Sequence, residues 1–356
     1  MVEEGAEADL GDAAAMNLSA YRGGIVMSGG RSLEEFEDFI KERVKEDMFS
    51  GAVLIAREDT PFFKKAYGLA SKRFGALNRV DTKFNIGSLN KMFTQVAITQ
   101  LVEKGKVEND IPIKEYLPDY PPNVASRVTI DHLLHFTSGM GHYWNERFFA
   151  SMGRLRRVDD FVSLFVDEPL AFEPGERYQY SNNGYVLLGK IVEAVSGMDY
   201  YDYVRENVYE PAGMKDTDYY ELDVPVPNLA TGYTRMDAQG RPLPGPRRSN
   251  LFIIGVKGSP AGGGYSTVED LLRFDIALHE NRLLGPDYTS TIFPTKPEED
   301  GKPNVMIRAG GAPGVSAFFL KFPGLGYTAI VLSNYDPVDS KVVADRIRDL
   351  VLGTSS

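Results

Sequence analysis

Phe84-Asn-Ile-Gly-Ser-Leu-Asn-Lys91 stands just before a segment whose apolar residues keep a helical spacing as far as Glu103. It holds the chain's single Ser-x-x-Lys, formed by Ser88 and Lys91. Residues three apart share a face of a helix, so the Lys91 amino group can reach the Ser88 hydroxyl. A serine attacks only after a base takes its proton, and a lysine whose pKa is lowered by burial can act as that base. The segment predicts a nucleophilic serine at the start of a helix over residues 88–103. An N-capping serine beside an exposed lysine is the alternative.

Tyr180-Ser-Asn182 is the second candidate element. Another Tyr-x-Asn occurs at Tyr143-Trp-Asn145, so the pattern alone does not decide between them. Only the first directly precedes a strong helical pattern, at residues 184–195. A phenol fixed at such an edge can relay a proton between Ser88, Lys91 and a leaving group. We expect that role for Tyr180 and a contact to the substrate for Asn182. A tyrosine that only caps the helix is the alternative.

Arg308-Ala-Gly-Gly-Ala-Pro-Gly314, which precedes a predicted strand, is the third candidate element. Glycines such as Gly310 and Gly311 let a substrate lie close against the backbone, where one N–H can complete an oxyanion hole. A plain turn leading into the strand is the alternative.

Composition and charge exclude several classes of protein. Of the 356 residues 43% are hydrophobic, enough for one large domain or two interlocked ones. The net charge of −11 argues against nucleic-acid partners and anionic membranes. The absence of cysteine excludes disulfides and a thiol nucleophile. No apolar run approaches the roughly 18 residues of a membrane helix, and no signal peptide is visible. We expect a flexible tail over residues 1–30 and a cytoplasmic protein, with an exported mature form as the alternative.

Other familiar sites are missing or incomplete. The chain has no Gly-x-Ser-x-Gly, which disfavours an α/β-hydrolase. Residues 184–190 match the start of a phosphate-binding loop, but Ile191 stands where that loop needs Ser or Thr. The histidines at positions 132, 135 and 142 lack a carboxylate at metal-ligand spacing, so we interpret them as structural.

Strand patterns at both ends of the chain surround a mainly helical middle. We expect a helix from a capping box at Ser32 to Lys45, a hairpin over 51–67, strands over 317–322 and 327–334, and a last helix over 340–352. Residues 107–290 show mostly helical spacing, interrupted by Pro and Gly. This order predicts an α+β fold, with a sheet subdomain of about residues 31–85 plus 290–352 and a helical subdomain of about 86–289.

Together these elements resemble the serine β-lactamase and penicillin-binding-protein superfamily, and more closely its class C β-lactamase-like branch with the family VIII carboxylesterases. Ser-x-x-Lys and Tyr-x-Asn are the first two motifs of that branch. Further similar segments, in family order, are 132–139, 172–197, 210–217 and 261–270, so the likeness runs from about residue 35 to 350. It implies an antiparallel sheet flanked by helices, one catalytic unit over residues 31–352, and no metal or organic cofactor.

The resemblance also implies roles for single residues. Ser88 would be acylated, with Lys91 as its base, Tyr180 as the proton relay, and Asn182 contacting Lys91 or a substrate amide. The backbone N–H groups of Ser88 and Gly311, next to Gly310, would form the oxyanion hole. This chain departs from the family at the third motif. The family has Lys-Thr-Gly or His-x-Gly there, and the aligned residues of this chain are Arg308-Ala-Gly310. Arginine can hold a substrate carboxylate but cannot shuttle a proton.

Three functions agree with these residues. We favour a serine hydrolase that cleaves small carboxylic esters. The alcohol that leaves an ester needs less protonation than the amine that leaves an amide, so the altered third motif is a smaller obstacle to ester cleavage. A D-amino-acid peptidase, an amidase or a weak β-lactamase is the alternative, favoured by Arg308 as a carboxylate anchor. The third is a non-catalytic relative that binds a peptide or peptidoglycan fragment. The aromatic residues at 136, 143, 144, 148 and 149 are a candidate wall for an apolar acyl group, with plain core as the alternative.

Overall fold

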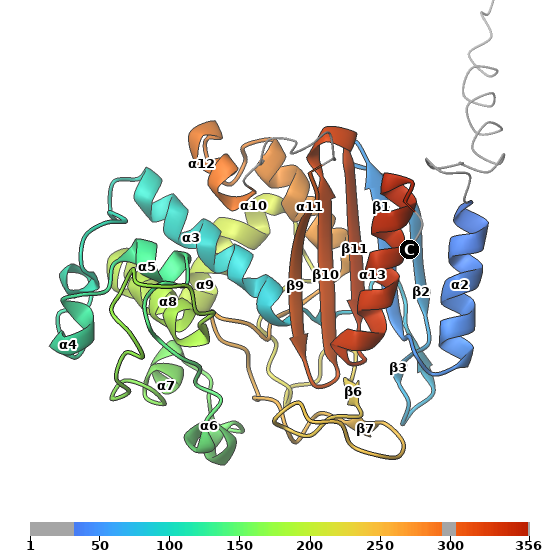
Figure 1. Ribbon diagram of the computed structural model, residues 1–356, viewed down its shortest axis with the longest axis horizontal. Coiled ribbons are helices and arrows are strands. Elements are labelled where there is room, and N and C mark those ends of the chain that lie inside the picture. Colours follow the sequence, from blue (N-terminus) through green and yellow to red (C-terminus); the bar gives the residue numbers. More distant parts are fainter. Residues whose placement is uncertain (1–31, 294–303, 355–356) are drawn as a thin grey trace, which may run out of the picture.

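A five-stranded sheet forms the middle layer of the computed structural model, which describes residues 32–293 and 304–354 (Figure 1). The predicted tail over residues 1–30 lies outside these described residues. The strand order is β2-β1-β11-β10-β9, and every neighbouring pair is antiparallel. The strands are β1 (Gly51–Arg57), β2 (Thr60–Tyr67), β9 (Met306–Ala312), β10 (Val315–Phe322) and β11 (Tyr327–Ser333). The two ends of the described chain therefore build one sheet.

Both faces of this sheet are buried. Successive side chains of a strand point to opposite faces. In β1, Ala52 and Leu54 accordingly join one apolar core, while Val53 and Ile55 join the other. Helices α2 (Leu33–Lys45) and α13 (Pro337–Leu352) cover the second face, and α11 (Val268–His279) packs on the first (Figure 1).

The helical part lies beside β9, at the left of Figure 1. Its elements are α3 (Lys91–Glu103), α4 (Pro122–Ala125), α5 (Ile130–Leu134), α6 (Glu146–Ser151), α7 (Val158–Val162), α8 (Asn182–Ser196), α9 (Tyr200–Val204), α10 (Glu210–Ala212) and α12 (Pro286–Ile292). Short strand pairs lie outside the five-stranded sheet: β3 (Leu69–Ser71) with β4 (Ala76–Leu77), β5 (Phe84–Asn85) with β8 (Tyr265–Ser266), and β6 (Tyr233–Thr234) with β7 (Arg248–Ser249).

The structure confirms the predicted α+β class with a flanked antiparallel sheet, and it corrects three details. Residues 213–267 hold short strands and loops instead of helix, because glycine and proline recur through them. The glycine-rich segment predicted to precede a strand is itself strand β9, paired along its length with β10. The last helix begins at Pro337 rather than Ser340, because proline fits a first helical turn, where no backbone donor is lost.

A buried ion cluster fixes the long loop between β6 and β7. The Arg247 side chain is 1% exposed, and its guanidinium lies 3.0 Å from Asp336 and 2.6 Å from Asp339. The Tyr335 ring packs 4.0 Å from the same guanidinium. Asp336 also accepts hydrogen bonds from the backbone N–H groups of Gly314 and Arg235, both at 2.8 Å. The cluster thus joins the β6–β7 loop to the β9–β10 turn.

Replacing Arg247 by Met should lower the free energy of unfolding by about 3–5 kcal/mol, because two buried carboxylates lose their counter-charge. Arg241→Met is the matched control, since Arg241 lies on the same loop, its side chain is 75% exposed, and its ion pair is with the nearby Asp237. Urea unfolding midpoints of both variants check this. Equal midpoints for the two variants would contradict the prediction.

Candidate active site

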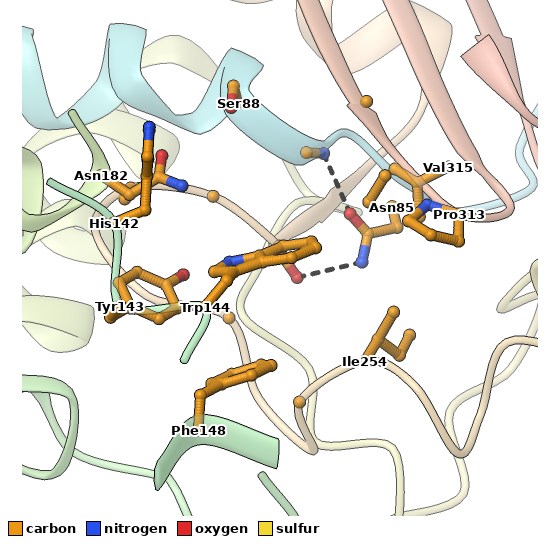
Figure 2. A pocket seen from close by; sticks show the side chains of 18 of the residues that line it. Asn85, Ser88, His142, Tyr143, Trp144, Phe148, Asn182, Ile254, Pro313 and Val315 are labelled. Carbon is orange, nitrogen blue, oxygen red and sulfur yellow. Dashed lines mark hydrogen bonds between the residues drawn. The ribbon is translucent and has the colours of Figure 1, made fainter. Parts of the chain in front are cut away.

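Ser88 lies in a short 3-10 turn, η1 (Gly87–Asn90), between β5 and α3. The α-helix itself begins at Lys91, three residues later than the sequence predicted. Two bonds shape the turn: Leu89 N–H donates to Ile86 O, and Gly87 N–H donates to Asn85 Oδ1 at 2.9 Å (Figure 2). Gly87 has φ +50°, a conformation that glycine adopts most readily. Asn85 thereby fixes the backbone just before the nucleophile, a role that sequence reasoning missed.

Lys91 is enclosed beside the Ser88 hydroxyl. Its Nζ lies 3.3 Å from Ser88 Oγ and donates to Asn182 Oδ1 at 2.8 Å and to Ala261 O at 2.5 Å. Burial holds the pKa of the Lys91 amine well below its ordinary value, because the charged form is deprived of water. A neutral amine has two N–H groups and one lone pair. With both N–H groups bound to carbonyl oxygens, the lone pair is left to accept the Ser88 proton.

Tyr180 approaches the same hydroxyl from the other side. Its OH donates to Ser88 Oγ at 2.7 Å. Burial raises the pKa of Tyr180 to about 12, although the bond to Ser88 opposes the rise. The phenol therefore keeps its proton at neutral pH and is available as an acid. The ring is held by Phe136, whose centroid lies 4.8 Å away. Phe136 thus supports Tyr180 and is not among the residues that line the cavity.

Strand β9 meets the turn of Ser88 backbone to backbone. A Cβ on Gly310 would lie 2.0 Å from Ile86 O and 2.8 Å from Ser88 N. A Cβ on Gly87 would lie 2.9 Å from Gly311 N. Only glycine permits this approach, and Ser88 and Gly311 both line the cavity. Their predicted role as an oxyanion hole stays a prediction.

The loop over residues 258–264 closes the site, and sequence reasoning gave it no role there. Besides Ala261 O, which binds Lys91, this loop is held to η1 at one point and to α3 at another. Gly264 N–H donates to Asn90 Oδ1 at 2.7 Å, and Thr94 Oγ1 donates to Pro260 O at 2.7 Å. The run of three glycines at 262–264 was the available signal, since glycine marks close backbone approach.

Arg308 stands apart from this group. Its Nη2 donates to Ile292 O at 3.3 Å, and Arg308 is not among the described residues that line the cavity. The structure therefore brings Ser88, Lys91, Tyr180, Asn182, Gly310 and Gly311 together and leaves Arg308 at the margin. Its predicted contact with a substrate carboxylate stays a prediction.

A cavity of about 550 Å³ opens in front of Ser88. Aromatic side chains line it opposite the serine, as Figure 2 shows for Tyr143, Trp144 and Phe148. The Trp144 and Phe148 rings are stacked, with centroids 5.8 Å apart. Phe149 and Phe161 also line the cavity. The candidate aromatic wall is thus present except for Phe136, although Tyr143 and Phe148 are core residues as well. Lys257 lines the cavity with its ammonium 3.2 Å from Glu221.

No metal-ligating group of three or more His, Asp or Glu side chains occurs within residues 32–293 and 304–354. Among the helices of these same residues, none combines the length and apolar content that crossing a membrane requires.

The fold and this Ser-Lys-Tyr constellation are those of a serine hydrolase. Residues 36–352 match the family model described as Beta-lactamase, and the chain belongs to that family. Penicillin-binding protein 4* of Bacillus subtilis is 29% identical over 311 residues, which cover 80% of this chain and 68% of that protein. Esterase EstB of Burkholderia gladioli is 29% identical over 302 residues, which cover 77% of this chain and 76% of that protein. The crystal structure of a penicillin-binding protein from Bacillus halodurans matches with a TM-score of 0.75 and 33% sequence identity. The match covers 86% of this chain and 98% of that chain.

Gly310→Ala should lower kcat/KM for an ester by at least about 100-fold, because the new methyl group displaces the nucleophile from its position. Gly153→Ala is the control, since a Cβ there meets nothing within 4 Å. Hydrolysis of p-nitrophenyl butyrate is measured for both, with far-UV circular dichroism to verify folding. Wild-type activity in folded Gly310→Ala would contradict the close approach of β9.

Lys91→Arg should lower kcat/KM by about 10²–10⁴-fold, because a guanidinium keeps its proton and cannot act as a base. In the wild type, protonation of Lys91 removes the base, so kcat/KM should fall as the pH decreases through the lowered pKa of this amine. The rate should therefore reach its plateau well below pH 10.5. Lys190→Arg on the outside of α8 is the control. A rate that rises only near pH 10.5 would show that the Lys91 pKa is not lowered.

Proposed function

We propose that this chain hydrolyses uncharged carboxylic esters through an acyl-enzyme on Ser88. The observation that carries the proposal is the position of Ser88 Oγ, 3.3 Å from the Lys91 amine and 2.7 Å from the Tyr180 hydroxyl. One group is set to take the serine proton, and the other to give a proton to the leaving alcohol.

The reaction begins when the Ser88 proton passes to the lone pair of Lys91 and Oγ attacks the ester carbonyl. The negative charge on the carbonyl oxygen is stabilised by the N–H groups of Ser88 and Gly311. As the C–O bond to the alcohol breaks, the alcohol oxygen takes the proton of Tyr180, which is replaced by the proton on Lys91. Water then attacks the acyl carbon and releases the acid, restoring Ser88.

Charge in the cavity supports an uncharged substrate. β-Lactam antibiotics and peptide C-termini carry a carboxylate, which a site ordinarily binds with a free cation. Of the described cavity-lining residues, Lys257 is the one with an ammonium group, and Glu221 already pairs with it. The Arg308 guanidinium is bound to Ile292 O outside the cavity. An apolar wall and paired cations favour an ester over a carboxylate-bearing amide, peptide or β-lactam.

The three relatives named above are an esterase and two penicillin-binding proteins. A peptidase, amidase or weak β-lactamase therefore remains the second candidate, and a non-catalytic binding protein the third. These candidates differ in whether Ser88 reacts with a substrate at all, and in whether the enzyme prefers an ester or an amide or β-lactam substrate.

Purified protein should hydrolyse p-nitrophenyl butyrate faster than a chromogenic cephalosporin, and Ser88→Ala should lose both activities. Ser163→Ala, at an exposed position outside the cavity, is the matched control. Intact mass should show a butyryl adduct on the wild type and none on Ser88→Ala. Faster cephalosporin turnover would favour the β-lactamase alternative. Identical behaviour of wild type and Ser88→Ala on both substrates would support the binding protein.

A further inference from the structure

His142 lines the cavity with Ser88 and Tyr180, yet the mechanism above gives it no role. Its ring centroid lies 5.8 Å from that of Tyr180, with the two rings 32° from parallel. Figure 2 shows the imidazole beside Asn182 at the edge of the cavity. Neither ring nitrogen has a hydrogen-bond partner among the described residues. Both are thus open to a molecule in the cavity.

The backbone on each side of His142 is anchored. Gly141 O accepts hydrogen bonds from Ser181 Oγ at 3.0 Å and from Asn183 N–H at 3.2 Å, at the start of α8. On the other side, the Tyr143 hydroxyl bonds Ser259 Oγ at 3.0 Å. Since α8 also follows Tyr180 directly, the backbone that carries His142 is attached to the segment that carries the proton donor.

His142 differs from the other titratable groups that face the cavity. Burial lowers the pKa of His142 from its ordinary 6.5, because the charged form is deprived of water. The ring is neutral at pH 7 and can accept a proton. Tyr143 and Tyr180 keep their protons because burial raises the pKa of both. Lys257 is paired with Glu221.

We propose that His142 is the base that activates the water in deacylation, a step that rests on the proposed acyl-enzyme. Water gives one proton to an imidazole nitrogen while its oxygen bonds the acyl carbon. The bond from that carbon to Ser88 Oγ then breaks, and Oγ takes the proton of Tyr180. The imidazolium returns its proton to Tyr180, so the site is restored and the carboxylic acid leaves with the oxygen of water.

Rapid-mixing kinetics of p-nitrophenyl butyrate separate the two half-reactions. In His142→Gln the rate of the first nitrophenol release, which reports acylation, should stay close to that of the wild type. Steady-state turnover should fall by about 10²-fold or more. The butyryl-enzyme seen by intact mass should increase. In the wild type, protonation of His142 should slow deacylation as the pH decreases below 6.5, and this pH dependence of deacylation should be absent in His142→Gln. His135→Gln is the matched control, because that side chain is 66% exposed and lies outside the cavity.

Two results would overturn this role. Unchanged steady-state turnover in His142→Gln would show that another group activates the water. An equal fall of acylation and deacylation would show that His142 only shapes the cavity. Failure of the acyl-enzyme itself gives a different result, namely no butyryl adduct on either the wild type or His142→Gln.

Discussion

Removal of the Lys91 amine from water is the constraint on which the rest of the site depends. In solution this group would be an ammonium ion and no base at all. Three separate elements enclose it: α3 carries it, the start of α8 supplies Asn182 Oδ1, and the 258–264 loop supplies Ala261 O. Each acceptor takes an N–H, so the buried amine is satisfied as a neutral group and keeps its lone pair for Ser88. Packing of the helical part is therefore what makes the lysine a base.

The sheet contributes what the helices cannot. Helical elements supply the proton-transferring groups, whereas edge strand β9 presents bare backbone to the turn of Ser88. This contact requires that neither surface carries a side chain, which is met by Gly87 and Gly310. The site thus lies between the sheet and the helical part. Its residues are fixed relative to one another by the same packing that builds both cores.

Part of the cavity wall comes from a loop whose position depends on buried charges outside the cavity. Residues 238–240 of the β6–β7 loop line the cavity, and the cluster around Arg247 attaches that loop to the β9–β10 turn. This ion cluster therefore stabilises both that loop and the turn that follows the strand of Gly311. The aromatic residues opposite Ser88 offer apolar surface, and its burial against a bound molecule would supply binding free energy.

The sequence alone determined those features of the fold and the site that depend on the spacing of residues close together in the chain. The three-residue interval of Ser88 and Lys91, the choice of Tyr180 over Tyr143, and the strands at both ends were predicted, because each follows from short periodic patterns. It misjudged the loops over 213–267 and overlooked β9 as a strand. Ala261 lies 170 positions after Lys91 and is brought to it only by folding. Tertiary structure decided which groups lose water, and hence which are acids and bases, because desolvation depends on neighbours that are distant in the chain.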